Sequence, residues 1–290
     1  MTYNDRKRLG PGTPDCLRLL SFNIHAGTTT DRFHQYVTHS WRQVLPHHQR
    51  VRNLEAIARL AAGYDMVALQ EADAGSLRSG FINQSRYIAD HAELPFWHHQ
   101  ANRRLGNMSV TGNGFVGRFQ PEVVEEHRLP GAIPGRGCLL LRFGGSEGLV
   151  FAVVHLALGR RARGQQLSYL ARQLAGERRL VVMGDLNTEA TSPEIRSFCD
   201  ALDLHAPTAG LASYPAWQPQ RSIDHILVSE QMEISDARII AVPMSDHCPV
   251  ELTLVLPPDL SLEPSDRRPA GSAFHRAPLA APPAYQPAFR

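Results

Sequence analysis

Short apolar runs alternate along the chain with segments that carry a single apolar face. Seven runs are short, apolar and partly β-branched, which predicts β-strands. They are residues 17–24, 66–70, 138–143, 149–156, 180–183, 223–228 and 250–256. Several of them are apolar on both faces, as is typical of strands buried between two layers.

Three segments repeat apolar residues at helical spacing, at 51–61, 167–174 and 192–202. Glycines at 63 and 176 end the first two. The third begins at Ser192-Pro193, an N-cap residue followed by proline at the first helical position. The order of these elements predicts an α/β (α+β) fold in which two stacked sheets carry helices on their outer faces.

The polar and apolar pattern also divides the chain into three parts. Residues 1–15 lack an apolar pattern and are predicted to be a flexible lead-in. Residues 16–256 form one predicted domain without internal repeats. Residues 257–290 are rich in proline and lack apolar periodicity, which predicts a disordered tail.

Composition fits an ordinary globular protein, with 290 residues of which 43% are apolar and 20% charged. The four cysteines are far apart and form no Cys-x-x-Cys pair, so reduced thiols are expected rather than a disulfide scaffold or zinc cluster. No apolar run reaches the roughly 18 residues that a membrane span needs, and no secretion signal is evident. These features predict a cytoplasmic protein.

The net charge of the chain bears on whether nucleic acid is a binding partner. The formal net charge is +2, and residues 16–256 carry equal numbers of acidic and basic side chains. A domain that grips duplex nucleic acid through many phosphates usually has a basic surplus. Nucleic acid is therefore a possible but not a favoured partner of the neutral domain.

Polar residues interrupt or end the predicted strands at places where an apolar core would not choose them. Taken one at a time, each is more often a turn residue, a helix N-cap or a satisfied core residue. Together they would converge if the strands share one rim of the sandwich. The group comprises Asn23, Glu71, His155, Asp185, Asn187, Asp224, Asp246 and His247.

This set of donors favours one kind of cofactor. Carboxylate and amide oxygens without cysteine are what Mg²⁺ or Mn²⁺ prefers. Two histidines add proton transfer near neutral pH. A divalent metal, histidines and amides together are suited to the attack of water on a phosphate ester.

Five motifs in this order closely resemble the endonuclease/exonuclease/phosphatase superfamily. They are Ser-Phe-Asn at 21–23, Leu-Gln-Glu at 69–71, Val-His-Leu at 154–156, Gly-Asp-Leu-Asn at 184–187 and Ser-Asp-His at 245–247. The resemblance covers residues 16–256 and is greatest to small bacterial members. It implies a four-layer α/β/β/α sandwich similar to deoxyribonuclease I.

The resemblance also implies roles for these residues. Glu71 would be the principal metal ligand, with Asn23 and Asp246 completing or supporting the site. Asp185 would orient or deprotonate the attacking water, and Asn187 would hold the phosphate and that water.

The same resemblance implies that Asp224 orients His247, so that this pair acts on the water or on a phosphoryl oxygen. His155 would donate to a phosphate oxygen. Two weaker matches add Asn113 and Arg136 as residues that contact the substrate phosphate.

Two further features have competing interpretations. Five histidines lie between 25 and 48, and we interpret this segment as a solvated insertion rather than a second metal site, because their spacing fits no compact ligand set. Arg160, Arg161 and Arg163 begin a predicted helix, where they gain nothing from its dipole. Contact with an anionic leaving group and simple solvation both explain them.

The sequence thus predicts a Mg²⁺- or Mn²⁺-dependent phosphoesterase that hydrolyses a phosphodiester, with a phosphomonoester as the less favoured alternative. The substrate could be a lipid headgroup, a small phosphodiester or a nucleic acid, and a nuclease is one alternative. A catalytically silent interaction module with the same fold is an alternative of another class. A monomer is expected.

Overall fold

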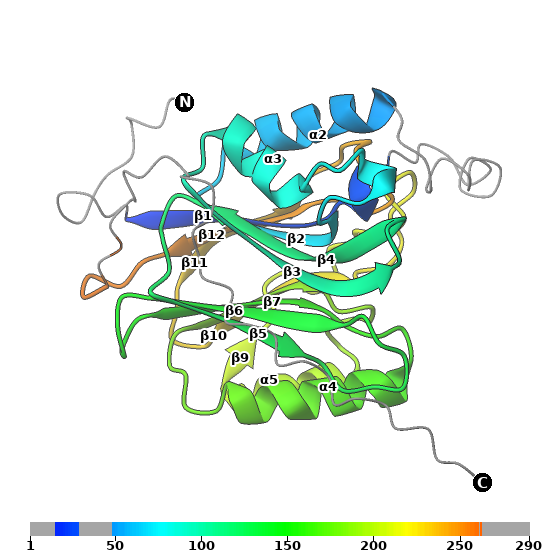
Figure 1. The fold of residues 1–290 in the computed structure, drawn as a ribbon. Coiled ribbons are helices and arrows are strands. Elements are labelled where there is room, and N and C mark those ends of the chain that lie inside the picture. The colour runs from blue at the N-terminus through cyan, green and yellow to red at the C-terminus, as the bar shows by residue number, and fades with distance from the viewer. Residues whose placement is uncertain (1–14, 29–47, 261, 263–290) are drawn as a thin grey trace, which may run out of the picture.

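A computed structural model of the chain describes residues 15–28, 48–260 and 262. Within these residues the strands form two six-stranded sheets. Sheet I has the order β11-β12-β1-β2-β4-β3 and sheet II the order β5-β6-β7-β8-β10-β9. Figure 1 shows the two sheets stacked face to face.

The strands of sheet I are β1 (Cys16–Asn23), β2 (Met66–Asp73), β3 (Phe96–Leu105), β4 (Ser109–Gly117), β11 (Ile234–Ile239) and β12 (Val250–Val255). Those of sheet II are β5 (Val123–Arg128), β6 (Gly137–Phe143), β7 (Leu149–His155), β8 (Leu180–Asp185), β9 (Leu204–His205) and β10 (Asp224–Ser229). In each sheet one central pair is parallel, β1 with β2 and β7 with β8, and the other pairs are antiparallel.

Helices cover the outer face of both sheets (Figure 1). Sheet I packs against α2 (His48–Ala61) and α3 (Gln84–Ala92), and sheet II packs against α4 (Arg160–Gln173) and α5 (Pro193–Leu202). Parallel strands need a crossover connection, and α2 and α4 supply it for the two parallel pairs. The predicted four-layer α/β/β/α sandwich is confirmed.

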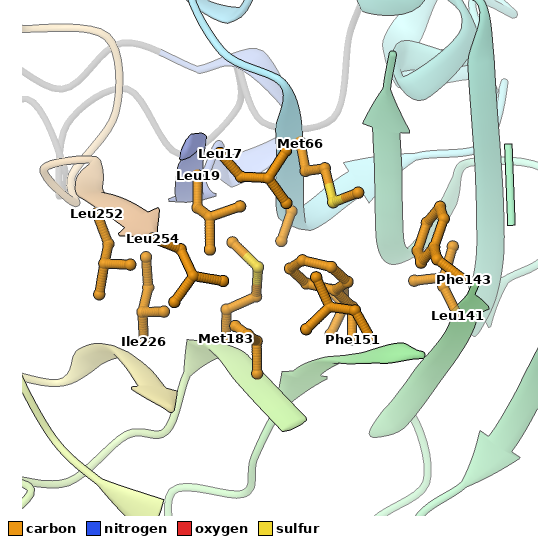
Figure 2. Packing of buried hydrophobic residues seen from close by; sticks show 14 of the residues in the cluster. Leu17, Leu19, Met66, Leu141, Phe143, Phe151, Met183, Ile226, Leu252 and Leu254 are labelled. Carbon is orange, nitrogen blue, oxygen red and sulfur yellow. The ribbon is translucent and has the colours of Figure 1, made fainter. Parts of the chain in front are cut away.

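Three apolar clusters hold these layers together. The largest lies between the sheets, where leucine, phenylalanine and methionine side chains from both sheets interdigitate (Figure 2). The other two lie under the helix pairs. The central strands therefore bury both faces, and a polar residue on such a strand is placed where the sandwich ends.

The predicted elements are present, with shifted bounds. The helix expected at 167–174 begins earlier, at Arg160, and the third helix begins at Pro193 after Ser192, as predicted. The sequence did not predict strands β3, β4, β5, β9 and β11 or helix α3. Most of these elements carry polar or exposed positions that hide the apolar pattern.

The two ends of the domain extend differently from the prediction. Leu260 and Leu262 are buried and belong to the core between the sheets, so this core extends past residue 256. Some predictions fall outside the described residues. These are the lead-in apart from residue 15, the tail from residue 263, and three of the five histidines, His34, His39 and His47. In the described part, no helix has the length and apolar character that crossing a membrane requires.

Candidate active site

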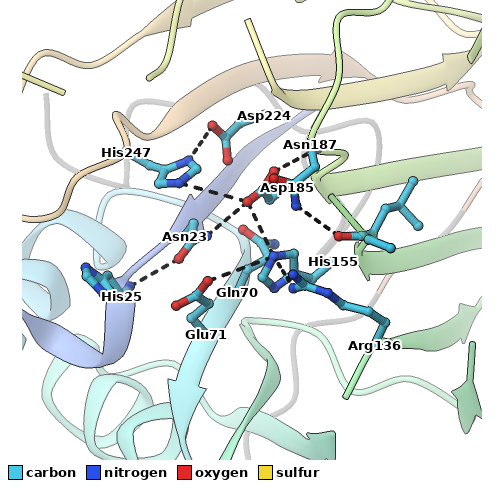
Figure 3. A network of polar contacts seen from close by, with 12 residues as sticks. Asn23, His25, Gln70, Glu71, Arg136, His155, Asp185, Asn187, Asp224 and His247 are labelled. Atoms are coloured by element: carbon cyan, nitrogen blue, oxygen red, sulfur yellow. Dashed lines mark hydrogen bonds and ion pairs between the residues drawn. The ribbon is translucent and has the colours of Figure 1, made fainter. Parts of the chain in front are cut away.

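Sheet II brings three of the predicted site residues to one level. His155 ends β7 and pairs in register with Asp185, the last residue of β8. Asp185 pairs in turn with Asp224, the first residue of β10. Residues opposite each other on neighbouring strands point to the same face, so the three side chains stand side by side (Figure 3).

His247 joins this row from the loop that precedes β12. Its Nδ1 lies 2.8 Å from Asp224 Oδ2, and Ser213 Oγ donates to the same oxygen at 2.6 Å. Burial by itself would lower the pKa of His247, but the charge and hydrogen bond of Asp224 outweigh it and raise the pKa to about 10. The Tyr214 ring lies beside the imidazole, with ring centres 4.8 Å apart. His247 is thus a fixed, protonated group.

Asp185 occupies the centre of the site. Its Oδ1 accepts a hydrogen bond from the Asn187 backbone at 2.9 Å, and its Oδ2 accepts one from Asn23 Nδ2 at 3.1 Å. Burial and the neighbouring Asp224 charge raise the pKa of Asp185 to about 7, against the opposing effect of His247. This carboxyl can therefore exchange a proton near neutral pH.

The turn after β8 is shaped by backbone conformation. Gly184 has φ +150°, and an added Cβ would lie 1.9 Å from the Val154 carbonyl oxygen, so only glycine fits. Asn187 adopts a left-handed conformation with φ 54°, and its Nδ2 donates to the Leu156 carbonyl at 2.9 Å. An amide NH₂ has two hydrogens, so Asn187 keeps a second one for another acceptor.

Sheet I contributes Asn23 and Glu71 from the opposite side. Glu71 lies where the pairing of β2 with β4 shifts register, and it has a left-handed backbone with φ 55°. A bulge of this kind redirects a side chain. Glu71 Oε1 lies 3.9 Å from His155 Nε2, which is itself 3.4 Å from Asp185 Oδ2.

These contacts link Glu71 to His247 through shared atoms. His247 Nε2 lies 3.9 Å from the same Asp185 Oδ2 that His155 approaches. The separation of Glu71 and His247 therefore cannot exceed three such short distances. The predicted convergence of both sheets at one rim is found in the structure.

Asp246 is tied to the same place. Ser245 Oγ donates to the Asn23 carbonyl at 2.7 Å and approaches Asp246 Oδ1 at 3.1 Å. His25 Nδ1 lies 3.4 Å from that Asp246 oxygen, and the His25 backbone donates to Asn23 Oδ1 at 3.2 Å. The sequence predicts a solvated insertion from His25 onwards, but the structure places His25 itself at the site.

Arg136 and His155 form the other boundary of the site. Arg136 Nη1 contacts His155 Nε2. Burial, with the neighbouring Arg136 charge, holds the pKa of His155 well below its usual value, so this imidazole is neutral. Arg136 brings a positive charge to a site that otherwise gathers carboxylates.

Asn113 is placed differently from the other predicted site residues. Its side chain is fully buried, and Nδ2 donates to the Gly137 carbonyl at 2.9 Å and to the Val153 carbonyl at 3.3 Å. These bonds join sheet I to sheet II. Contact between this donor and a substrate phosphate would require breaking them, so the structure gives the phosphate-binding prediction no support.

The side chains near Asn23 and Glu71 fit a hard divalent cation. Glu71, Asn23 and Asp246 all present oxygen atoms, as Mg²⁺ and Mn²⁺ prefer. Asp185, Asp224 and His247 also offer ligand atoms within 4.8 Å of one another. Within this second group Asp224 Oδ2 already accepts bonds from His247 and Ser213, whereas Asp224 Oδ1 has no hydrogen-bond partner.

Comparison with solved structures places the fold. A protein described as endonuclease/exonuclease/phosphatase from Beutenbergia cavernae matches with a TM-score of 0.65, at 19% identity over 83% of this chain and 72% of that one. A mannosyl-6-phosphatase from Bacteroides thetaiotaomicron matches with 0.60 at 16% identity, over 83% and 100%. The human Nocturnin catalytic domain matches with 0.60 at 17% identity, over 89% and 96%.

A search of curated proteins by sequence gave no significant match. A model of the Endonuclease/Exonuclease/phosphatase family, in contrast, matches residues 20–247. These residues run from within β1 to His247 and include the predicted site residues in both sheets. The chain therefore belongs to the endonuclease/exonuclease/phosphatase family, whose members are generally hydrolases of phosphate esters.

Proposed function

We propose that the chain is a divalent-metal-dependent phosphodiesterase. One observation carries the proposal: Asp185 lies between protonated His247 on one side and His155 with Glu71 on the other, within 3.4–3.9 Å contacts. Burying these charges together is costly unless a cation and an anionic ligand offset them. A phosphate ester with its metal would satisfy both needs.

Glu71, Asn23 and Asp246 would hold the metal. A bound Mg²⁺ or Mn²⁺ would supply positive charge to a phosphate oxygen as a Lewis acid. Glu71 is suited to this task because its side chain is about one-third exposed, at 36%, whereas the other site carboxylates are buried. A substrate and its ion can therefore approach it from solvent.

Asp185 of sheet II and His247 would carry out the proton-transfer and hydrogen-bonding steps. Asp185, with a pKa of about 7, would accept a proton from the attacking water as its oxygen bonds to phosphorus. His247, kept protonated by Asp224, would donate a hydrogen bond to a phosphoryl oxygen. The ester bond opposite the water would then break, and the leaving oxygen would take a proton from solvent.

Arg136, Asn187 and His155 would bind the phosphate. The Arg136 guanidinium offers a planar fork of donors that matches phosphate oxygens. Asn187 retains a donor hydrogen beyond the one given to Leu156. His155 is neutral, and its Nε2 lies beside Asp185 and Glu71, so the tautomer that carries its proton on Nε2 would donate to a phosphate oxygen.

Hydrolysis of bis(4-nitrophenyl) phosphate tests the proposal, with Mg²⁺, with Mn²⁺ and with EDTA, between pH 6 and 9. We expect turnover that requires metal and that Asp185→Asn lowers by about 10²–10⁴-fold. 4-Nitrophenyl phosphate in parallel would show whether a monoester is the better substrate. Absence of metal-dependent turnover on both would favour the silent interaction module and refute the enzyme.

The proposal also covers the substrate class, the cellular location and the oligomeric state. A panel of single-stranded DNA, RNA, lipid vesicles and small diesters would rank the substrate classes. The expectations of a cytoplasmic protein and of a monomer stay predictions. Light scattering of the purified chain would test the second one.

A further inference from the structure

Four segments adjoin the side of the candidate site that carries Glu71, Arg136 and His155, and we call them the rim: residues 74–82, 101–109, 129–136 and 156–166. The first follows the β2 strand that carries Glu71. The third ends at Arg136, and the fourth begins directly after His155. In Figure 1 this end of the sandwich lies at the right, where η2 (His25–Gly27) follows β1 and β3 turns into β4.

Contacts between neighbouring segments make the rim continuous. Leu77 and Arg78 donate backbone hydrogen bonds to carbonyls at 107 and 108, at 2.9 and 3.2 Å. Gly135 lies against the Arg103 side chain. Gln166 then joins the last two segments, since its side chain donates to the carbonyl at 130 at 3.0 Å and accepts from the backbone at 157 at 2.8 Å.

Exposed apolar side chains are concentrated on the rim. Of the eight large apolar side chains that are exposed in the described part of the chain, six lie on it. They are Leu77, Phe81, Leu105, Met108, Ile133 and Leu158. Ile133 and Leu158 are 80% and 76% exposed. An apolar group gathered around a site in this way marks an interaction surface.

The charge of the rim has one sign. Its four segments contain seven arginines and no lysine, aspartate or glutamate, whereas the whole chain has a net charge of only +2. Arg78 is paired with Asp73, and Arg160 and Arg163 are both paired with Glu194. Exposed Arg103, Arg104 and Arg161 extend the positive field towards solvent.

We propose that the rim docks the protein on the surface of an anionic lipid bilayer, with the aliphatic side chains inserted between headgroups and the arginines on the phosphates. Apolar residues at loop tips flanked by basic residues are suited to an interface of this kind. The site then faces the lipid headgroups. Docking itself does not require the proposed hydrolase activity.

Two other occupants fit the rim less well. Single-stranded nucleic acid is held largely by stacking on aromatic rings, and the rim has one aromatic residue, Phe81. A second copy of the chain would bring like charges opposite each other in a symmetric contact. Aliphatic tips with uniform positive charge match anionic lipid on both counts.

Vesicle flotation in EDTA tests docking, with the intact chain and its His247→Gln variant so that turnover plays no part. Vesicles of phosphatidylcholine are compared with vesicles containing about a third phosphatidylglycerol. We expect binding to the anionic vesicles that weakens in high salt. Leu105→Ser with Met108→Ser should lower the partition coefficient by about tenfold or more. Their matched control is Val51→Ser with Val123→Ser, the two large exposed apolar residues outside the rim in the described part of the chain.

A charge series completes the test. Arg103→Gln with Arg104→Gln should weaken binding by about fivefold per arginine, whereas Arg178→Gln with Arg196→Gln, at arginines outside the rim, should not. The proposal is overturned if the wild type ignores anionic vesicles or if the control pairs lose as much. It is also overturned if the chain binds single-stranded DNA more tightly than anionic vesicles and this binding does not depend on Leu105 and Met108. A dimer that is held together by Leu105 and Met108 would overturn it too. Activity on bis(4-nitrophenyl) phosphate reports separately on the proposed function.

Discussion

At the same level of the sandwich the two sheets carry polar rows of different chemistry. In sheet I, Asn23 pairs with Gln70 and Gln100 pairs with Asn113, so the row consists of amides. In sheet II the corresponding row is His155, Asp185 and Asp224, which are all ionisable. Except for Gln100, which lies on the edge strand β3, both rows lie on inner strands of their sheets.

The amide row forms buried hydrogen bonds between the sheets, which charged groups could form only at a larger desolvation cost. Gln100 donates to the carbonyls of His127 and Cys138, and Asn113 donates to that of Gly137, so both tie sheet I to sheet II. Amides make such bonds without the cost of burying a charge. The sheet II row bears that cost, which is why the pKa of Asp185 rises to about 7. In the proposed mechanism, sheet I would position the site and sheet II would transfer protons.

The largest expected effect is that of His247→Gln. The variant removes the protonated imidazole beside Asp185 and should lower kcat by about 10³-fold or more. Metal binding should change little, because the metal ligands proposed in sheet I remain. Steady-state kinetics with bis(4-nitrophenyl) phosphate and Mn²⁺ measure this effect. A variant with nearly wild-type kcat would remove His247 from the mechanism.

Glu71→Gln should act through the metal. Loss of one carboxylate ligand is expected to raise the Mn²⁺ concentration for half-maximal activity by at least about tenfold. The melting temperature should hold, since the side chain is partly exposed. A metal titration of activity gives the measurement, and an unchanged midpoint would argue against Glu71 as a ligand.

Much of the fold follows from the sequence because the buried strands have an apolar pattern that is visible locally. Strand β5 (VVEEHR) and strand β11 (ISDARI) do not, since they lie at or near sheet edges and expose polar side chains. Strand β4 is rich in glycine for a reason that only the fold reveals. A Cβ on Gly112 would lie 1.7 Å from the Gln100 carbonyl oxygen.

Some features of the site can also be predicted from the local sequence, whereas others depend on contacts between distant segments. A polar residue that ends an apolar strand, such as His155 or Asp185, can be recognised in the sequence. The contact of His25 with Asp246 depends on segments more than 200 residues apart, and no local pattern predicts it. The cross-sheet bonds of Asn113 are equally non-local, which is why its amide could be interpreted as a phosphate contact.

Asn113→Leu separates the two interpretations of that residue. Removing the amide leaves buried carbonyls at 137 and 153 without their donor, which should cost about 2–3 kcal/mol. Thermal unfolding should show a melting temperature lower by roughly 5–10 °C. The KM for bis(4-nitrophenyl) phosphate should change by less than about threefold. A large rise in KM without loss of stability would instead assign Asn113 to phosphate binding.

The smallest effect is a pH dependence of stability in EDTA. The pKa of His247 is raised from 6.5 to about 10 by Asp224, so the stabilisation is complete below pH 6.5 and is lost as pH rises towards 10. The melting temperature of the wild type should exceed that of Asp224→Asn by several degrees at pH 7, and this gap should shrink by pH 10. The pKa of Asp185 is raised to about 7, so its protonation also stabilises the folded chain, and this stabilisation is lost as pH rises towards 7. A gap that grows with pH would contradict the pairing.

Direct Mn²⁺ binding tests most sharply whether the two sheets divide the work. Isothermal titration of the wild type, Glu71→Gln and His247→Gln would measure affinity independently of turnover. We predict saturable binding by the wild type, a loss of at least about tenfold in Glu71→Gln, and nearly unchanged affinity in His247→Gln despite its loss of kcat. Equal affinity in wild type and Glu71→Gln, or a loss confined to His247→Gln, would contradict the account.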